Sequence, residues 1–144
     1  INIMRCINGC MDGNTMILMF DGSKKSICEI KIGELIRTDG ESCNRVSNIW
    51  CGQDMVIRIV TDSGNEIKLT KEHPIKAKNA WKRAGDVKVG DELCCVDGIY
   101  RVCTIEAVDG DVRVYNLELE YDNDGIFANN ILVGDFKRQN SCLN

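Results

Sequence analysis

The sequence predicts an all-β domain assembled from two related halves, and three observations lead to that prediction. Short apolar or alternating runs are separated by turns rich in Gly and Asp, as expected of a chain with many short strands. A segment at 29–34 resembles one at 86–91, so part of the chain repeats at an offset of 57 residues. Helix signals are weak, and the best of them are single turns near 29–36 and 81–87.

Turn signals divide the chain into its expected strands. Residues 15–20 form an apolar run that Asp21-Gly22 ends. The stretch 62–65, Asp-Ser-Gly-Asn, separates two β-branched alternating runs and is typical of a hairpin turn. The dipeptides Asp97-Gly98 and Asp109-Gly110 give the same signal further along the chain.

The repeat extends beyond its first pair of segments. Residues 45–49 match 101–105, and the alternating stretch 56–60 matches 112–117, in the same order in both halves. Two copies at this long period favour a duplicated half-domain with pseudo-twofold symmetry, because a solenoid needs at least about three repeats.

Composition and charge narrow the class of protein. A chain of 144 residues, 44% hydrophobic and 28% charged, has the size and composition of one globular domain. Its net charge of -4 argues against a nucleic-acid groove, which needs a basic field. No apolar run reaches the roughly 18 residues that span a membrane, and the opening residues lack the apolar core of a signal peptide. We expect a monomer that binds neither nucleic acid nor a membrane.

Nine cysteines are many for this length, but they do not form an evident metal or disulfide framework. Their number is odd, CxxC spacing is absent, and the single histidine would leave a zinc site almost entirely to thiolates. We expect no metal and no cofactor, with most thiols buried, reduced and packed as small apolar groups. Such cysteine usage favours a reducing compartment, as in a cytoplasmic protein.

Five segments, taken in order, resemble the sequence blocks of one superfamily. They are 10–17, 67–74, 81–91, 114–119 and 127–133. The first block opens with a cysteine and has a threonine five positions on, and the second contains Thr-x-x-His followed by Pro. Together they resemble Hint domains, the superfamily of inteins, bacterial intein-like domains and hedgehog-type processors. The resemblance implies a pseudo-twofold horseshoe of duplicated β-strand halves that processes its own polypeptide.

The resemblance also assigns the reacting residues. Cys10 is the expected nucleophile, which attacks the carbonyl of Gly9 in an N–S acyl shift and gives a thioester. Glycine leaves that carbonyl sterically open. His73, the single histidine, is expected to give a proton to the leaving nitrogen near neutral pH, and Thr70 to hold the same amide with its hydroxyl.

Less active interpretations of these residues stay open. Cys10 can be an ordinary buried thiol, His73 a turn residue held by the following proline, and Thr70 a plain strand position. Cys6 can be the reactive thiol instead, or a disulfide partner that switches Cys10 off by oxidation.

The C-terminal block departs from the familiar intein pattern. An intein ends its last strand with a histidine and an asparagine, but here Gly134-Asp135-Phe136 follows the strand, and Asp124 stands where an upstream histidine is common. An aspartate carboxylate at 135 is a poor nucleophile for the succinimide-forming step. Asn140 followed by Ser141 has suitable chemistry for cyclisation and ester acceptance, although Asn14-Thr15 shows that such a pair can arise by coincidence.

We therefore expect an upstream flank at 1–9, a processing domain at 10–135 that can extend to Asn140, and a downstream segment at 136–144. The expected activity is autocatalytic processing of the chain's own flanks, by splicing or by cleavage with an outside thiol, amine or water as acceptor. The alternatives are an inert, degenerate Hint domain that serves as a structural or binding module, and a cysteine-rich metal or redox module. The length leaves no room for a homing endonuclease.

Overall fold

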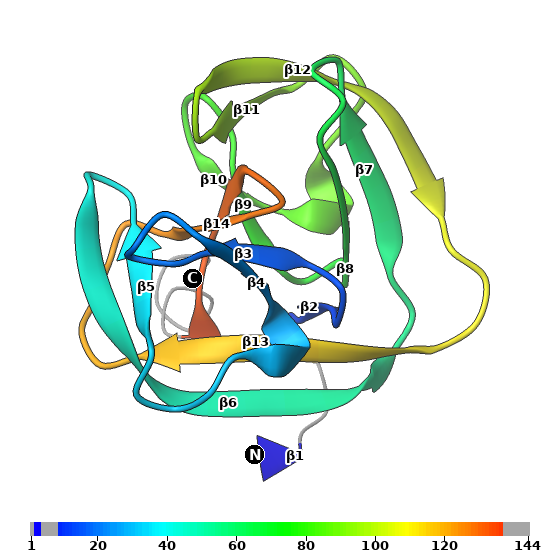
Figure 1. Ribbon diagram of the computed structural model, residues 1–144. Coiled ribbons are helices and arrows are strands. Elements are labelled where there is room, and N and C mark those ends of the chain that lie inside the picture. Colours follow the sequence, from blue (N-terminus) through cyan, green and yellow to red (C-terminus); the bar gives the residue numbers. More distant parts are fainter. Residues whose placement is uncertain (1, 4–8, 137–144) are drawn as a thin grey trace.

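The protein is described by a computed structural model for residues 2–3 and 9–136. Within these residues the chain forms fifteen strands, β1–β15, and two single-turn 3-10 helices, η1 and η2. The strands join in one continuous, strongly curved sheet, so the predicted all-β fold is confirmed (Figure 1). No helix in this part of the chain is long and apolar enough to cross a membrane.

The N-terminal half carries the strands up to the first predicted hairpin turn. Its elements are β1 (Asn2–Ile3), β2 (Met11–Asp12), β3 (Met16–Leu18), β4 (Lys24–Ser26), η1 (Ile27–Glu29), β5 (Leu35–Thr38), β6 (Ser42–Asp54) and β7 (Ile57–Thr61). The predicted helical turn near 29–36 is displaced, because η1 already ends at Glu29 and Ile30 is extended.

The second half follows the turn at 62–65, where β7 and β8 form the predicted antiparallel hairpin. Its elements are β8 (Glu66–Leu69), β9 (Pro74–Lys76), β10 (Trp81–Arg83), η2 (Ala84–Asp86), β11 (Glu92–Cys95), β12 (Gly98–Ala107), β13 (Val112–Leu119), β14 (Ile126–Ala128) and β15 (Ile131–Val133). The helical turn predicted at 81–87 is confirmed as η2.

The sequence repeat is also a structural repeat. The N–H of Gly33 donates to the carbonyl of Val46 at 2.9 Å, and the N–H of Gly90 donates to that of Val102 at 2.8 Å. Both glycines have positive φ, +97° and +96°, a conformation that side chains rarely tolerate. The recurring glycine therefore marks the same tight turn in each half.

The two halves are joined by exchanged strand pairs. β6 of the first half pairs with β13 of the second, and β7 pairs with β12, all antiparallel (Figure 1). β2 lies between β8 and β13. β14 and β15 pair with each other and with strands of both halves, so they link the two ends of the sheet.

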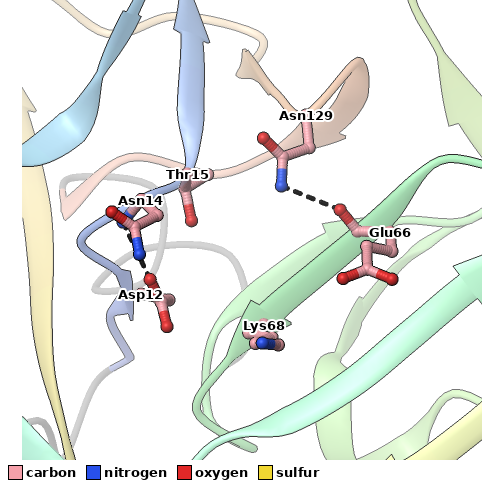
Figure 2. A pocket seen from close by; sticks show the side chains of 6 residues that line it. All are labelled: Asp12, Asn14, Thr15, Glu66, Lys68 and Asn129. Carbon is pink, nitrogen blue, oxygen red and sulfur yellow. Dashed lines mark hydrogen bonds between the residues drawn. The ribbon is translucent and has the colours of Figure 1, made fainter.

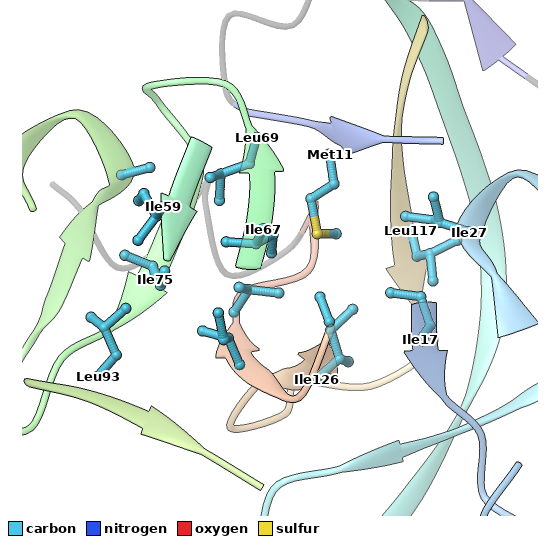
Figure 3. Packing of buried hydrophobic residues seen from close by; sticks show 14 of the residues in the cluster. Met11, Ile17, Ile27, Ile59, Ile67, Leu69, Ile75, Leu93, Leu117 and Ile126 are labelled. Carbon is cyan, nitrogen blue, oxygen red and sulfur yellow. The ribbon is translucent and has the colours of Figure 1, made fainter. Parts of the chain in front are cut away.

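Aliphatic side chains from both halves meet in one core (Figure 3). The largest fully buried ones include Met11, Ile17, Ile27, Ile59, Ile67, Leu69, Ile75, Leu93, Leu117 and Ile126. Strand alternation produces this arrangement: in β7, Ile57, Ile59 and Thr61 are buried, whereas Arg58 and Val60 are only partly covered. Each fully buried aliphatic side chain contributes roughly 1.5–3 kcal/mol.

The prediction that most cysteines are buried is wrong for the described part of the chain. Cys10, Cys51 and Cys95 are buried, but three of the seven described thiols are exposed, and Cys94 is intermediate. The exposed ones are Cys28, Cys43 and Cys103. Cys43 and Cys103 each lie next to a buried residue of the same strand, so their side chains point to the opposite, outer face of the sheet.

Candidate active site

The peptide bond between Gly9 and Cys10 is buried at the start of β2. Cys10 has 0% exposure, and Gly9 has a φ of +112°. The next residue, Met11, is opposite Leu69 of β8 on one side and Tyr115 of β13 on the other. The end of β8 and the middle of β13 therefore lie on either side of this bond.

Thr70 holds the nitrogen side of the bond. The N–H of Cys10 donates to Thr70 Oγ1 at 2.9 Å, and the N–H of Thr70 donates to the carbonyl of Cys10 at 2.9 Å. Thr70 comes directly after β8, so its position follows from the pairing of β8 with β2. The hydroxyl of Thr70 therefore contacts the amide nitrogen of Cys10, where the sequence placed it.

Asn116 holds the carbonyl side, a contact that the sequence analysis did not anticipate. Its Nδ2 donates to the carbonyl oxygen of Gly9 at 3.0 Å, and the whole residue is buried. Asn116 Oδ1 accepts the N–H of Leu117 at 2.8 Å, which fixes which way the amide points. The available signal was a polar residue inside the buried part of β13, where an apolar residue is expected.

His73 lies in the tight turn between β8 and β9 and is fully buried. Its backbone N–H donates to the carbonyl oxygen of Thr70 at 3.2 Å, and its own carbonyl oxygen accepts the N–H of Ala84 at 2.9 Å. On the ring, Nε2 is 2.8 Å from the carbonyl oxygen of Gly134. Because a carbonyl only accepts, Nε2 carries the proton in the neutral ring and Nδ1 carries the lone pair.

Burial changes the protonation of His73. Its pKa is lowered from 6.5 to about 4, because burial penalises the charged ring more than the backbone groups of Gly134 and Gly9 favour it. Nδ1 is buried, and within the described part of the chain no hydrogen bond of ordinary geometry reaches it. The sequence suggested a ring that titrates near neutral pH, whereas the folded protein holds a neutral imidazole there.

The residues predicted at the C-terminal junction are only partly described. Asp135 is fully buried, and its Oδ2 accepts the N–H of Leu119 at 3.1 Å. Asp124 is exposed and lies in the loop before β14. Asn140, Ser141 and Cys6 lie outside the described residues, so the junction at 140–141 and the disulfide with Cys10 stay predictions.

A small polar cavity of about 180 Å³ lies beyond β2, on the side of the loop that follows it (Figure 2). It is lined by Asp12, Asn14, Thr15, Glu66, Lys68 and Asn129. Most of its polar groups are engaged: Asp12 accepts the N–H of Asn14, and Asn129 donates to the carbonyl of Glu66. Thr15 Oγ1 is buried without a hydrogen bond within the described structure. No cluster of three metal-ligating side chains exists in the part of the chain that the structure describes.

Comparison with known proteins places these features in one family. Residues 9–135 match the Hint-domain family Vint, which begins one residue before Cys10 and ends at Asp135. The chain also resembles the DNA-directed RNA polymerase subunit Rpo1N of Methanocaldococcus jannaschii, with 32% identity over 95 residues. That match covers 58% of this chain but only 7% of the relative, so it concerns a small part of that protein.

Solved structures of inteins share the fold. The Ssp DnaB mini-intein variant M86 has a TM-score of 0.81 at 20% identity, with 92% of this chain and 96% of the mini-intein covered. The bacterial intein-like domain from Clostridium thermocellum has a TM-score of 0.75 at 25% identity, with 88% and 98% covered. At these identities the similarity concerns chain architecture, which agrees with the horseshoe of duplicated halves expected from the sequence.

Proposed function

The chain belongs to the Hint-domain family Vint, and we propose that it processes its own polypeptide by converting the Gly9–Cys10 peptide bond into a thioester. One observation carries the proposal: this bond is held from both sides. Asn116 donates to its carbonyl oxygen at 3.0 Å, and its N–H donates to Thr70 at 2.9 Å. The same two contacts place a hydrogen-bond donor on the carbonyl oxygen and an acceptor on the nitrogen of the bond that would react.

The proposed step begins with the thiol of Cys10. Its proton passes to Nδ1 of neutral His73, and the thiolate attacks the carbonyl carbon of Gly9. The carbonyl oxygen becomes negatively charged, and the N–H of Asn116 stabilises that charge in a dry site. A donor of this kind is typically worth about 10²–10³ in rate.

The second part of the step breaks the carbon–nitrogen bond. Protonated His73 gives its proton to the nitrogen of Cys10, which leaves as a free amine, while the Gly9 acyl group stays on sulfur. The low pKa of His73, about 4, makes the protonated ring a strong acid towards that nitrogen. Thr70 keeps the nitrogen in place before the transfer.

The conformation of Gly9 supports its place in this scheme. Its φ of +112° is strained for a residue with a Cβ, so a glycine fits here at little cost. The absent side chain also leaves the face of the carbonyl open to sulfur.

We further propose the chain's division into an upstream flank at 1–9, a processing domain at 10–135 and a downstream segment at 136–144. Asp135 occupies the end of the domain, and its carboxylate is engaged by the N–H of Leu119. A carboxylate in that contact does not form a succinimide, which favours N-terminal thioester formation followed by cleavage with thiol, amine or water. Splicing through Asn140 and Ser141 remains the alternative outcome, with the domain then extending to Asn140.

The competing proposal is an inert Hint domain kept as a structural or binding module. The absence of the His-Asn pair at 134–135 favours it, since Gly134 has no side chain that could take part in a C-terminal step. The two proposals differ in whether Cys10 reacts.

The test is a time course of intact mass for the chain with a small folded tag before Ile1. Our proposal expects upstream release that depends on added thiol and disappears in Cys10→Ala. A matched control is Cys95→Ala, another buried thiol, which should release at the unchanged rate. Release that is equal in wild type and Cys10→Ala, or absent from both, would favour the inert domain.

A further inference from the structure

The second part of β6, residues 47–54, extends beyond the stretch that pairs with β5. β13 pairs with β6 along one edge, but β5 covers the other edge only at Ser42–Arg45. Among the described residues, the strand that continues on this edge is β1, which runs parallel to β6 (Figure 1). β1 belongs to the segment upstream of Gly9. We call residues 47–54 the outer part of β6.

The register of β1 relates it to the proposed reacting bond. Asn2 is opposite Trp50, and Ile3 is opposite Cys51. Trp50 is in turn opposite Asn116 of β13, whose amide holds the Gly9 carbonyl. β1, β6 and β13 thus lie side by side in the sheet.

The same part of β6 also contacts the downstream side of the domain. The ring of Phe136, directly after Asp135, stacks on Trp50 with centroids 4.8 Å apart and planes 15° apart. Trp50 Nε1 donates to Glu118 Oε1 at 3.3 Å, which fixes the indole against β13. Offset stacking of this kind typically adds about 0.5–1.5 kcal/mol beyond the buried area.

We propose that the outer part of β6 is a docking strand for the polypeptide that flanks the domain. It takes the upstream segment as an added parallel strand and an aromatic residue at 136 as its downstream contact. This inference rests on the proposed function, because it names how that reaction binds its substrate. Strand addition works through main-chain hydrogen bonds, so it accepts many upstream sequences and disfavours proline.

Docking would serve the reaction by limiting the motion of the acyl side. With the upstream segment held on β6, the carbonyl of Gly9 stays at Asn116 and near the Cys10 sulfur. Losing the main-chain hydrogen bonding between β1 and β6 is expected to slow the acyl shift by about ten-fold.

The first test compares two upstream variants in the tagged chain. Asn2→Pro/Ile3→Pro removes both N–H groups of β1, whereas Asn2→Ala/Ile3→Ala keeps them. We expect thiol-dependent release to slow about ten-fold in the proline variant and to stay within about two-fold of wild type in the alanine variant. Equal rates in the two variants would overturn docking through the main chain.

A second test does not depend on processing at all. In the Cys10→Ala background, amide hydrogen exchange of peptides covering 47–54 should be slower with the natural upstream segment than with the proline pair. Equal exchange would overturn the proposal. If the exchange of 47–54 is slowed but the wild-type chain never releases its tag, the docking proposal stands. The proposed function is then refuted.

The aromatic contact is tested by quenching of Trp50 fluorescence in a Trp81→Phe background. Phe136→Ala should make Trp50 more accessible to acrylamide, and Phe136→Tyr should leave it unchanged, because the stacked ring remains. If both variants quench like the parent, the downstream contact is not made in solution and that half of the proposal fails.

Discussion

The two halves of the molecule share a scaffold but differ in what they place at one equivalent turn. The N–H of Ile27 donates to the carbonyl of Thr15 at 2.8 Å, and that of Ala84 donates to the carbonyl of His73 at 2.9 Å. Thr15 and His73 thus occupy the same position relative to η1 and η2, and both are buried. In the second half this position faces Gly9, whereas in the first half it lines the small polar cavity.

In the proposed function, the reactive site lies almost entirely in one half of this duplicated fold. The side chains that hold or face the Gly9–Cys10 bond, Thr70, His73 and Asn116, all lie in the second half. The first half contributes the bond itself and the strand β6 beside it. The two halves therefore share one framework, and they differ in the side chains that they place around the proposed reacting bond.

The largest expected effect on the rate of upstream release comes from a substitution at the proposed site in the second half. His73→Ala removes the proposed proton carrier, and we expect the rate of upstream release to fall by about 10²–10⁴. Thr15→Val, at the equivalent position of the other half, should leave the rate within about two-fold. Rates from intact mass, with folding checked by circular dichroism, distinguish the two. Similar losses in both variants would show that the turn matters for folding alone.

Much of this comparison was accessible from the sequence. The 57-residue offset places Lys31–Glu34 on Lys88–Asp91, and both form the same turn, with side chains of Glu34 and Asp91 accepting a backbone N–H. The repeat could be recognised because its turns depend on local residues, such as a glycine at positive φ.

The contact of Asn116 with Gly9 was not accessible, for a physical reason. It joins residues far apart in the chain and depends on the pairing of β2 with β13, which the repeat does not specify. The sequence also did not reveal which cysteines are exposed, because cysteine is compatible with either face of a strand. The exposed ones are Cys28, Cys43 and Cys103. The residue type alone does not determine whether a side chain in a strand points to the core or to solvent.

The second expected effect concerns the carbonyl side of the bond. Asn116→Ala should slow upstream release by about 10²–10³, the usual loss for one donor to a developing oxyanion. Val60, the matching position in β7 of the other half, provides the control: Val60→Ala should change the rate by less than about two-fold. A rate unchanged by Asn116→Ala would remove the oxyanion role from the account.

A third prediction uses the pH dependence of stability. Because the pKa of His73 is about 4 when folded and 6.5 when unfolded, the unfolded chain binds more protons between these values. Stability from this residue is therefore fully present above pH 6.5 and is lost as the pH falls towards 4. Urea unfolding at pH 7.5 and 5 should show wild type losing about 2 kcal/mol more than His73→Gln. Equal losses would mean that the ring is not buried in the neutral form.

The smallest expected effect tests the equivalence of the halves. Lys25 contacts Glu34 at 2.7 Å, and Lys82 contacts Asp91 at 3.1 Å, both at the surface. Lys25→Met and Lys82→Met should each reduce the free energy of unfolding by about 0.5 kcal/mol or less, with Lys25→Met the larger. Thermal unfolding at low and high salt measures both, since salt should diminish each loss. A large loss in one half alone would break the equivalence.

The central claim is that Gly9–Cys10 is the bond that rearranges, and the mass of the released upstream fragment tests it most directly. After incubation with a small thiol, the account predicts a fragment that ends at Gly9 and carries that thiol as a thioester. The fragment should lose the adduct on treatment with hydroxylamine and be absent from Cys10→Ala. A fragment ending elsewhere, or a wild-type chain that stays intact with every thiol, would contradict the account.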